Sequence, residues 1–403
     1  MDENKAEAPQ AASGTEQQNI GTKAAKKSGG KQPRKQNSLL RQLPAGILTL
    51  LLIMAALLVF VYRDAFSSDN LRQLFARENS VTPARDAFTY ETGAEQVFAP
   101  AGDGLAVACS SSVQLLDDKG QTVYKQVVSF DLPAVFACSE QALFCDLGGT
   151  DCIVADMEGG SKNLGGNREI LSASMNDSGW FSLVTAEPGY KGLVSVYSAD
   201  CEKRFEWWSG AGYVLRAVVS PDNRNLAVLS AEKEGSYLRF FALNSEKVQA
   251  ELLLENLLFY DLYYLNDNTL CMIGDSGLYY VSTDGTVKHE YLFNGSYLLD
   301  YEFNQNFIAV FLSNYHSGAG GKLLTLDQKA SVLGVQALDR DVISLSAVGK
   351  QLLVMTGGGL VLYDQALVRQ YANETLMTAL RAILRPAGDI LLLSAYSAER
   401  FSF

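Results

Sequence analysis

Two cysteines have the spacing at which a disulfide can form across a β-hairpin. Cys145 and Cys152 flank Gly148-Gly149, a pair that favours a two-residue turn. Such a turn places the two cysteines opposite each other on neighbouring strands, with β-carbons about 4.5 to 5.5 Å apart. That separation is compatible with a disulfide, and equally with two free thiols buried as small apolar side chains. Both alternatives stay open.

Other residues with catalytic or metal-binding chemistry do not cluster in the sequence. His289 and His316 are 27 residues apart and match no metal-ligand spacing, so both are expected in surface loops. The glycine-rich segment 316–322 superficially resembles a phosphate-binding loop, but His316 stands where glycine is required, and Leu323 where Ser or Thr would bind magnesium. It is predicted to be a hairpin loop. Without a nucleophile elbow or a Cys-x-x-Cys motif, the sequence predicts neither an enzyme nor a metal or cofactor.

Aromatic residues are the remaining candidates for a functional surface. Trp207, Trp208 and Tyr213 lie in a segment that joins two sequence repeats, and Tyr260 and Tyr263 lie in an aromatic run that enters the next. Alternation along a strand turns every second ring outward, where it could contact a protein or a glycan. The alternative is that these rings pack inside the fold.

The elements that position these residues form a repeat after residue 86. Each unit holds an alternating strand, a continuously apolar strand, a third strand that ends in an apolar residue followed by Asp, Ser or Asn, and a more polar strand. The spacings of these endings are 39, 42, 46, 38, 45 and 37 residues, close to the roughly 40 to 45 residues of a four-stranded propeller blade. The endings are Leu116-Asp117, Ala155-Asp156, Tyr197-Ser198, Leu243-Asn244, Val281-Ser282, Leu326-Asp327 and Tyr363-Asp364.

The continuously apolar strands, such as 105–109 and 142–145, are expected to be the innermost of each blade because both of their faces must be covered. An eighth unit starts at Leu380 and stops one strand short. The alternating segment 86–91 supplies that strand and would close the ring, which removes two exposed edges. The fold class is therefore predicted to be all-β, a β-propeller of eight four-stranded blades, or seven if one degenerate unit is a loop.

This pattern resembles the quinoprotein-like and WD-repeat-like propellers over residues 86–403. The stretch 220–228, SPDNRNLAV, is similar to the turn and strand of such repeats. Because Trp-Asp and Gly-His dipeptides are absent, the resemblance implies the architecture and not a WD-repeat function. The layout also resembles uncharacterised membrane-anchored propellers of bacterial envelopes, which carry no known catalytic residues.

Residues 44–62, PAGILTLLLIMAALLVFVY, contain no charged side chain and would span roughly 30 Å as a helix. A buried core helix would show a polar stripe, and a signal peptide would have a shorter apolar centre of about 7 to 15 residues. The segment is therefore predicted to be an uncleaved transmembrane anchor. Residues 63–85 are predicted to be a stalk with a short amphipathic helix at Leu71, Leu74 and Phe75.

The polar tail 1–43 has almost no large apolar side chain and is predicted to be disordered. It carries eight Lys and Arg residues, whereas only four follow the anchor within reach, so the tail is expected in the cytoplasm and residues 86–403 outside the plasma membrane. The whole chain has a net charge of −12, and without the tail 25 cations face 41 acids. Nucleic acid is therefore excluded as an expected partner.

Two functions fit these expectations. The first is a membrane-anchored, extracytoplasmic scaffold that binds another protein of the cell envelope, because a propeller presents many loops on a rigid ring. The second is a ligand-sensing module that holds a glycan or peptide with aromatics and acids at the channel mouth. A broad apolar patch on one face would favour the first function, and a cluster of outward aromatic and acidic residues at the channel would favour the second.

Overall fold

The computed structural model describes residues 87–316, 320–374 and 378–401. The predicted cytoplasmic tail, transmembrane helix and stalk lie outside these residues. Within the described ranges, no helix is long and apolar enough to cross a membrane.

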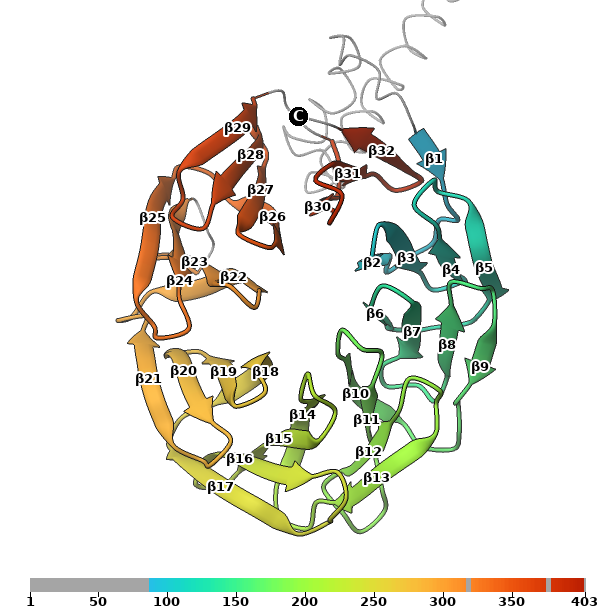
Figure 1. Ribbon diagram of the computed structural model, residues 1–403, viewed down its shortest axis with the longest axis vertical. Helices are drawn as coiled ribbons and strands as arrows, with labels where there is room; N and C mark the ends of the chain where they lie inside the picture. The colour runs from blue at the N-terminus through green and yellow to red at the C-terminus, as the bar shows by residue number, and fades with distance from the viewer. Residues whose placement is uncertain (1–86, 317–319, 375–377, 402–403) are drawn as a thin grey trace, which may run out of the picture. The chain divides into compact units, whose positions relative to one another are not determined.

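The described residues form eight four-stranded antiparallel sheets arranged in a ring around a central channel (Figure 1). Blades 1 to 4 contain β2 (Val97–Ala101), β3 (Gly104–Ala108), β4 (Ser112–Leu116), β5 (Thr122–Val127); β6 (Pro133–Ala137), β7 (Gln141–Asp146), β8 (Cys152–Asp156), β9 (Ser161–Asn163); β10 (Ile170–Met175), β11 (Phe181–Thr185), β12 (Leu193–Tyr197), β13 (Lys203–Trp208); β14 (Tyr213–Val219), β15 (Asn225–Glu232), β16 (Gly235–Ala242) and β17 (Val248–Glu255). Blades 5 to 8 contain β18 (Phe259–Asn266), β19 (Thr269–Gly274), β20 (Gly277–Ser282), β21 (Val287–Leu292); β22 (Tyr297–Phe303), β23 (Ile308–Ser313), β24 (Gly321–Leu326), β25 (Val332–Leu338); β26 (Val342–Val348), β27 (Gln351–Thr356), β28 (Gly359–Asp364), β29 (Arg369–Asn373); β30 (Arg381–Leu384), β31 (Ile390–Leu393), β32 (Ser397–Phe401) and β1 (Ala87–Thr89).

The repeated third-strand endings correspond to one recurring turn. In blade 6, the Asp327 carboxylate accepts hydrogen bonds from the backbone N–H groups of Lys329 and Ser331, both at 2.8 Å. Asp117, Asp156 and Asp364 accept the equivalent pair in their own turns. The carboxylate satisfies backbone donors that the turn leaves without a partner, which explains why Asp recurs at this position.

The core consists of eight apolar clusters in the described part of the chain, and each cluster fills the seam between two neighbouring blades. The second and third strands of each blade are the most deeply buried, as in β3 and β4, where all five residues of each strand are buried. The continuously apolar second strands were predicted to be innermost, which is wrong. They lie second from the channel, because that place has a strand on each side as well as a blade over each face.

The ring closes as predicted, by pairing the two ends of the domain. β1 pairs with β32 in the register Phe88↔Ala398, which completes blade 8 and sets the blade number at eight. Just after β1, the Tyr90 hydroxyl donates to the carbonyl oxygens of Ser394 and Ser397 at 2.6 and 2.9 Å, and its ring lies in the seam between blades 8 and 1. The closure gives the third strand of blade 8, β32, a partner on its outer side, as in the other seven blades.

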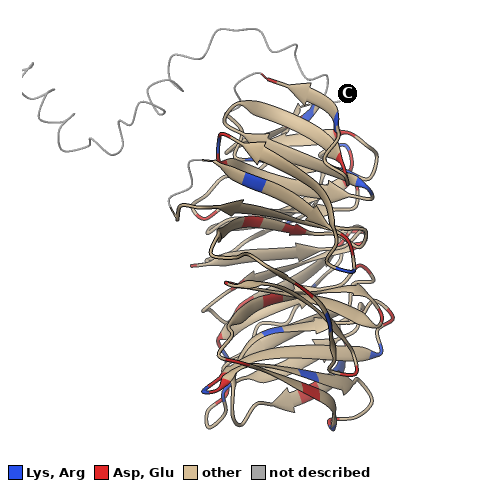
Figure 2. Cartoon of the chain, turned by 90° about the vertical axis from the view of Figure 1, so that its left-hand side faces the viewer, with Lys and Arg blue, Asp and Glu red and all other residues tan. Residues whose placement is uncertain are grey.

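The ring has two faces, which differ in the loops that they carry. All innermost strands run the same way, and we call the face where they begin the entry face and the other the exit face. The entry face carries the loops from each outer strand to the next blade and those between second and third strands. In a side view, Lys, Arg, Asp and Glu lie mainly in loops at the two faces and on outer strands (Figure 2). β1 runs from the exit face, so the chain reaches the ring there, at Ala87.

Candidate functional site: an apolar collar at the channel mouth

A β-bulge recurs near the start of the innermost strand in five successive blades, 3 to 7. In each of them the pairing with the second strand skips one residue, for example between Phe259 and Asp261 in β18. A bulge residue has no partner across the strand, and its side chain is re-aimed out of the ladder. The five skipped residues are all large and apolar: Leu171, Leu215, Tyr260, Leu299 and Ile343.

These side chains lie at the entry-face mouth of the channel, because the innermost strands form the channel wall and the bulges are near their beginnings. Leu132 and Leu380 directly precede the innermost strands of blades 2 and 8 and extend the set. Six of the seven side chains are 36% to 52% exposed, and Leu215 is partly buried. We call Leu132, Leu171, Leu215, Tyr260, Leu299, Ile343 and Leu380 the collar. It has one member in each of seven successive blades, 2 to 8, and only Leu215 packs against a core cluster.

Five further tyrosines surround the collar on the same face, each between 47% and 67% exposed. Three are in loops between second and third strands, and two open an innermost strand. The Lys191 ammonium nitrogen lies 3.1 Å from the Tyr213 hydroxyl and 4.5 Å from the centre of its ring, and the His316 ring packs edge-on against Tyr297 at 5.3 Å. An apolar centre with a tyrosine-rich rim is the composition of protein–protein interfaces. The five are Tyr190, Tyr213, Tyr297, Tyr315 and Tyr396.

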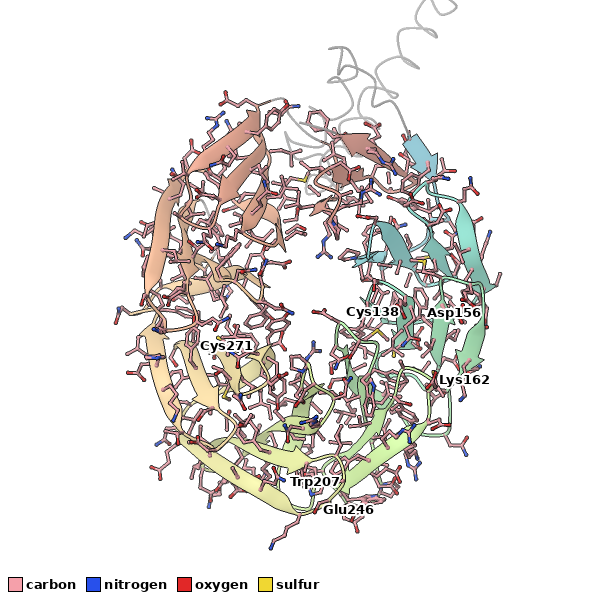
Figure 3. The ribbon with its side chains drawn as sticks, viewed as in Figure 1. Cys138, Asp156, Lys162, Trp207, Glu246 and Cys271 are labelled. Carbon is pink, nitrogen blue, oxygen red and sulfur yellow. The ribbon has the colours of Figure 1, made fainter. Side chains whose placement is uncertain are left out.

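The aromatic residues singled out from the sequence divide between this surface and the core. Trp208, Tyr213 and Tyr260 are exposed at the entry face. Trp207 packs against Phe241 with ring centres 5.0 Å apart, near the outer edge of the ring and away from the channel (Figure 3). Tyr263 stacks on Phe303 at 5.2 Å and lies deeper in the channel wall. The five residues therefore do not form one patch.

Below the collar, a polar network joins the innermost strands of several blades. The Arg216 guanidinium on β14 contacts the Asp261 carboxylate on β18 at 3.0 Å, and the second oxygen of that carboxylate accepts a hydrogen bond from the Tyr301 hydroxyl on β22 at 2.9 Å. Arg216 also donates to the carbonyl oxygen of Ala173 on β10 at 2.9 Å and lies over the Phe136 ring on β6. This network compensates the charge of Asp261 within the channel wall.

A second pair of acids on the channel wall has no such compensation. Asp300 and Glu302 lie on one side of β22, and neither forms an ion pair among the described residues. The Asp300 carboxylate accepts the backbone N–H of Tyr301 at 2.8 Å, and Glu302 accepts that of Ala347 at 3.3 Å. Burial raises the pKa of Asp300 to about 6 and that of Glu302 to about 7, although the positive charge of Arg381 lowers both.

The exit-face mouth is narrowed by a contact across the channel. The Gln305 side chain of blade 6 donates to the Asp177 carboxylate of blade 3 at 3.0 Å. Beside this contact lies a recess of about 290 Å³, lined by both residues and by Tyr263 and Tyr264. The Tyr264 hydroxyl is buried and has no hydrogen-bond partner in the described residues. Burial raises the pKa of Tyr263 to about 12, with further contributions from Asp177 and Glu302.

A wider cleft between blades 2 and 3 opens at the exit face, with a volume of about 810 Å³. Cys138, Asp156 and Lys162 line it (Figure 3). Their polar groups already serve the local turns, since the Asp156 carboxylate accepts two backbone N–H groups and the Lys162 ammonium donates to the carbonyl oxygen of Cys201 at 3.3 Å. Glu140, Glu158 and Asp200 also line the cleft, and all three are exposed.

The predicted register of the cysteine hairpin is confirmed. Cys145 on β7 pairs directly with Cys152 on β8, and their sulfur atoms are 3.3 Å apart as free, buried thiols. The hydrogen bond with Cys152 and burial raise the pKa of the Cys145 thiol. A disulfide between them stays a prediction.

The histidines do not form a metal site. His289 was predicted in a loop and lies instead on the outer strand β21, paired with Tyr280, because the strand extends to Leu292. His316 lies in the turn after β23, as expected for a loop residue. No group of three or more metal-ligating side chains occurs in the described ranges. The glycine-rich segment lies between β23 and β24, which pair with each other, and its residues 317–319 lie outside the described residues.

The collar was not found from the sequence. Its leucines stand among other apolar residues of the strands, and only the register against the second strand shows which of them is skipped. A usable signal would have been the extra residue in the first strand of units 3 to 7, but this requires both strand ends to be known.

Comparison with solved structures supports the propeller fold. Sqt1 of Saccharomyces cerevisiae aligns with a TM-score of 0.58 at 12% identity, over 80% of this chain and 100% of that chain. BamB of Moraxella catarrhalis aligns with a TM-score of 0.52 at 10% identity, over 80% and 100%. The C-terminal WD40 domain of Sif2 aligns with a TM-score of 0.55 at 11% identity, over 81% and 99%. At these identities, the likeness to WD40 and BamB-type propellers shows the fold alone.

Sequence comparison adds a family but no activity. No curated protein matches the chain. The model of one protein family, described as "Family of unknown function (DUF5711)", matches residues 83–387.

Proposed function

The chain belongs to this family of unknown function, DUF5711, and on that premise we propose that its propeller is a protein-interaction scaffold that binds a partner of the cell envelope through the entry face. The anchor proposed at residues 44–62 holds it at the plasma membrane with the propeller outside. The collar and the tyrosines around it are the observation that carries the proposal.

The collar supports this function because six of its seven side chains are at least one-third exposed, and only Leu215 packs against a core cluster. A soluble ring can keep its channel mouth polar, whereas here seven apolar side chains gather there. Stable interfaces bury about 1,200 to 2,000 Å² in total and place apolar residues at the centre with Tyr around them. The ring begins at Ala87 on the exit face, the face opposite the collar.

A second candidate function is ligand binding at the exit-face recess. Tyr263, Tyr264, Asp177 and Gln305 combine aromatic rings with hydrogen-bonding groups in a recess of about 290 Å³. Such a combination suits a small polar ligand such as a sugar unit. The recess has fewer exposed groups than the collar, so we place this function second.

Crosslinking pull-down from membranes tests the proposal with three forms of the full chain. The test form carries L171S, L299S and I343S in the collar. The matched control carries V332S, V335S and V368S, which replace three apolar residues that are at least as exposed, two on the outer strand β25 and one directly before the outer strand β29. We expect the same envelope protein to be recovered with the wild type and the control and to be lost with the collar variant.

Recovery of that protein with all three forms would overturn the entry-face proposal. If no protein is recovered and only cell-wall glycan or a small ligand binds, the second candidate replaces the scaffold function.

A further inference from the structure

We propose that the occupant of the collar is a partner protein segment with a Lys or Arg among apolar residues, and that its cation enters the channel toward Asp300 and Glu302. This inference rests on the proposed function and adds the chemistry of the partner.

The two acids lie directly beneath the collar. Leu299, the collar residue of blade 6, immediately precedes Asp300, and Glu302 follows two positions later on the same side of β22. Along the strand, Asp300 is about 3 Å and Glu302 about 10 Å beyond Leu299, so a long side chain that packs on Leu299 extends toward both carboxylates. The long aliphatic stem of Lys or Arg suits this path, since the stem packs on apolar surface while the charge extends beyond it.

The surroundings of the two acids leave them open to a cation. Asp261, on the neighbouring wall, is already paired with Arg216 at 3.0 Å and with the Tyr301 hydroxyl. In contrast, each of Asp300 and Glu302 accepts one backbone N–H and no cation among the described residues. The Arg381 guanidinium on β30, whose positive charge acts on both acids, donates to the carbonyl oxygen of Phe98 at 3.1 Å and forms no ion pair with either acid in the described ring.

Charge complementarity indicates that the partner segment carries a positive charge. Two partly buried acids on one side of one strand repel each other, and burial without a partner is unfavourable for both. An incoming cation relieves both effects, whereas an incoming carboxylate would add to them. A free amine would meet the same acids but could not cover the collar, so the apolar flanks of the segment are needed for binding.

Binding should also depend on pH. The groups that face the pair are Arg381 from β30, the Ala347 N–H from β26, and Tyr263 from β18, which Glu302 influences. The raised pKa values of about 6 and 7 mean that the acids gain protons as the pH falls from 8 to 5, and the attraction for a cation weakens accordingly.

Two fluorescein-labelled probe peptides test the inference against the full chain by fluorescence anisotropy. One contains Leu-Leu-Lys-Leu-Leu between Gly-Ser flanks, and the other has Gln in place of Lys. For the wild type at pH 7.5, we expect about tenfold tighter binding of the Lys peptide, the effect of roughly 1.4 kcal/mol. The D300N/E302Q variant should bind both peptides equally, and the preference of the wild type should decline at pH 5.

The collar variant L171S/L299S/I343S separates this inference from the proposed function. If it loses both peptides while the wild type binds them equally, the cation inference is wrong and the entry-face function stands. If the collar variant binds both peptides as the wild type does, the collar is not the binding surface, and both the cation inference and the entry-face function are wrong. Urea unfolding of every form shows whether a loss of binding reflects a loss of folding. The single variant D300N, which keeps Glu302, provides a milder change of the same acid pair.

Discussion

At the scale of single residues, the channel wall separates an acid that has a partner from acids that do not. Asp261 is held by Arg216 and Tyr301, and the three side chains connect blades 4, 5 and 6. Removing one member leaves the others partly buried without a partner. The loss in free energy of unfolding is then larger than the net contribution of the intact interaction.

Arg216→Ala should lower the free energy of unfolding by about 2 kcal/mol, because it leaves the Asp261 carboxylate without its cation. Urea unfolding at pH 7.5 measures the change. Arg224→Ala is the matched control. The Arg224 side chain is 83% exposed, and its contact with Asp222 is long, at 4.0 Å. We therefore expect no change in the free energy of unfolding of this variant. Equal midpoints for the two variants would show that the network does not stabilise the ring.

Asp300 and Glu302 should make the propeller less stable as the pH rises. Their pKa values in the folded chain, about 6 and 7, lie above those of an unfolded chain, near 4. Between these values, the folded form holds protons that the unfolded form has released, so the contribution of both acids is fully present below about pH 4 and is lost as the pH rises through 6 and 7.

The D300N/E302Q variant should therefore unfold at a higher urea concentration than the wild type at pH 7.5, by up to about 3 kcal/mol, and with little difference at pH 4. The difference between the two forms isolates these acids from all other titrating groups. A constant difference over the whole pH range would contradict the raised pKa values.

At the scale of elements, the strand that closes the ring, β1, is one of the two shortest strands described, with three residues. β1 pairs over only three residues with β32, while the Tyr90 side chain adds two hydrogen bonds and fills the seam to blade 1. Without β1, the third strand of blade 8 becomes an unpaired edge, which favours aggregation.

A chain that starts at Asn79 should melt as the full chain does, because it retains β1 and Tyr90. A chain that starts at Gly93 lacks both and should melt at least about 5 °C lower and aggregate on heating. Differential scanning fluorimetry and light scattering measure the two effects. Identical melting of the two truncated forms would mean that the closing strand is dispensable.

The elements also show what a sequence can and cannot predict here. The recurring Asp at the end of the third strand was visible because one side chain must satisfy two backbone donors in every such turn, as Asp327 does. The order of the strands within a blade, counted outward from the channel, was partly wrong. A uniformly apolar strand indicates that both of its faces are buried, but not how far it lies from the channel. The bulges at Leu171 or Leu299 were missed because both faces of these strands are covered near the channel, so the apolar pattern does not fix the register.

At the scale of the whole molecule, the number of blades and the closure of the ring followed from the repeat, and the docking face did not. The predicted aromatic surface split because Trp207 and Tyr263 fill seams between blades, and the sequence does not show which side of a strand meets a neighbouring blade. Three of the five predicted aromatic residues are nevertheless exposed on the face that carries the collar: Trp208, Tyr213 and Tyr260.

The contact between Asp177 and Gln305 has a mechanical consequence for the ring. Eight units joined at their seams behave as a hinged polygon, which keeps its circumference but can still shear from round to oval. A tie between units 3 and 6 acts as a diagonal brace and opposes that shear in its own half of the frame. The exit-face mouth is thus tied on the side of blades 3 to 6, and we expect it to widen more readily toward blades 7, 8 and 1.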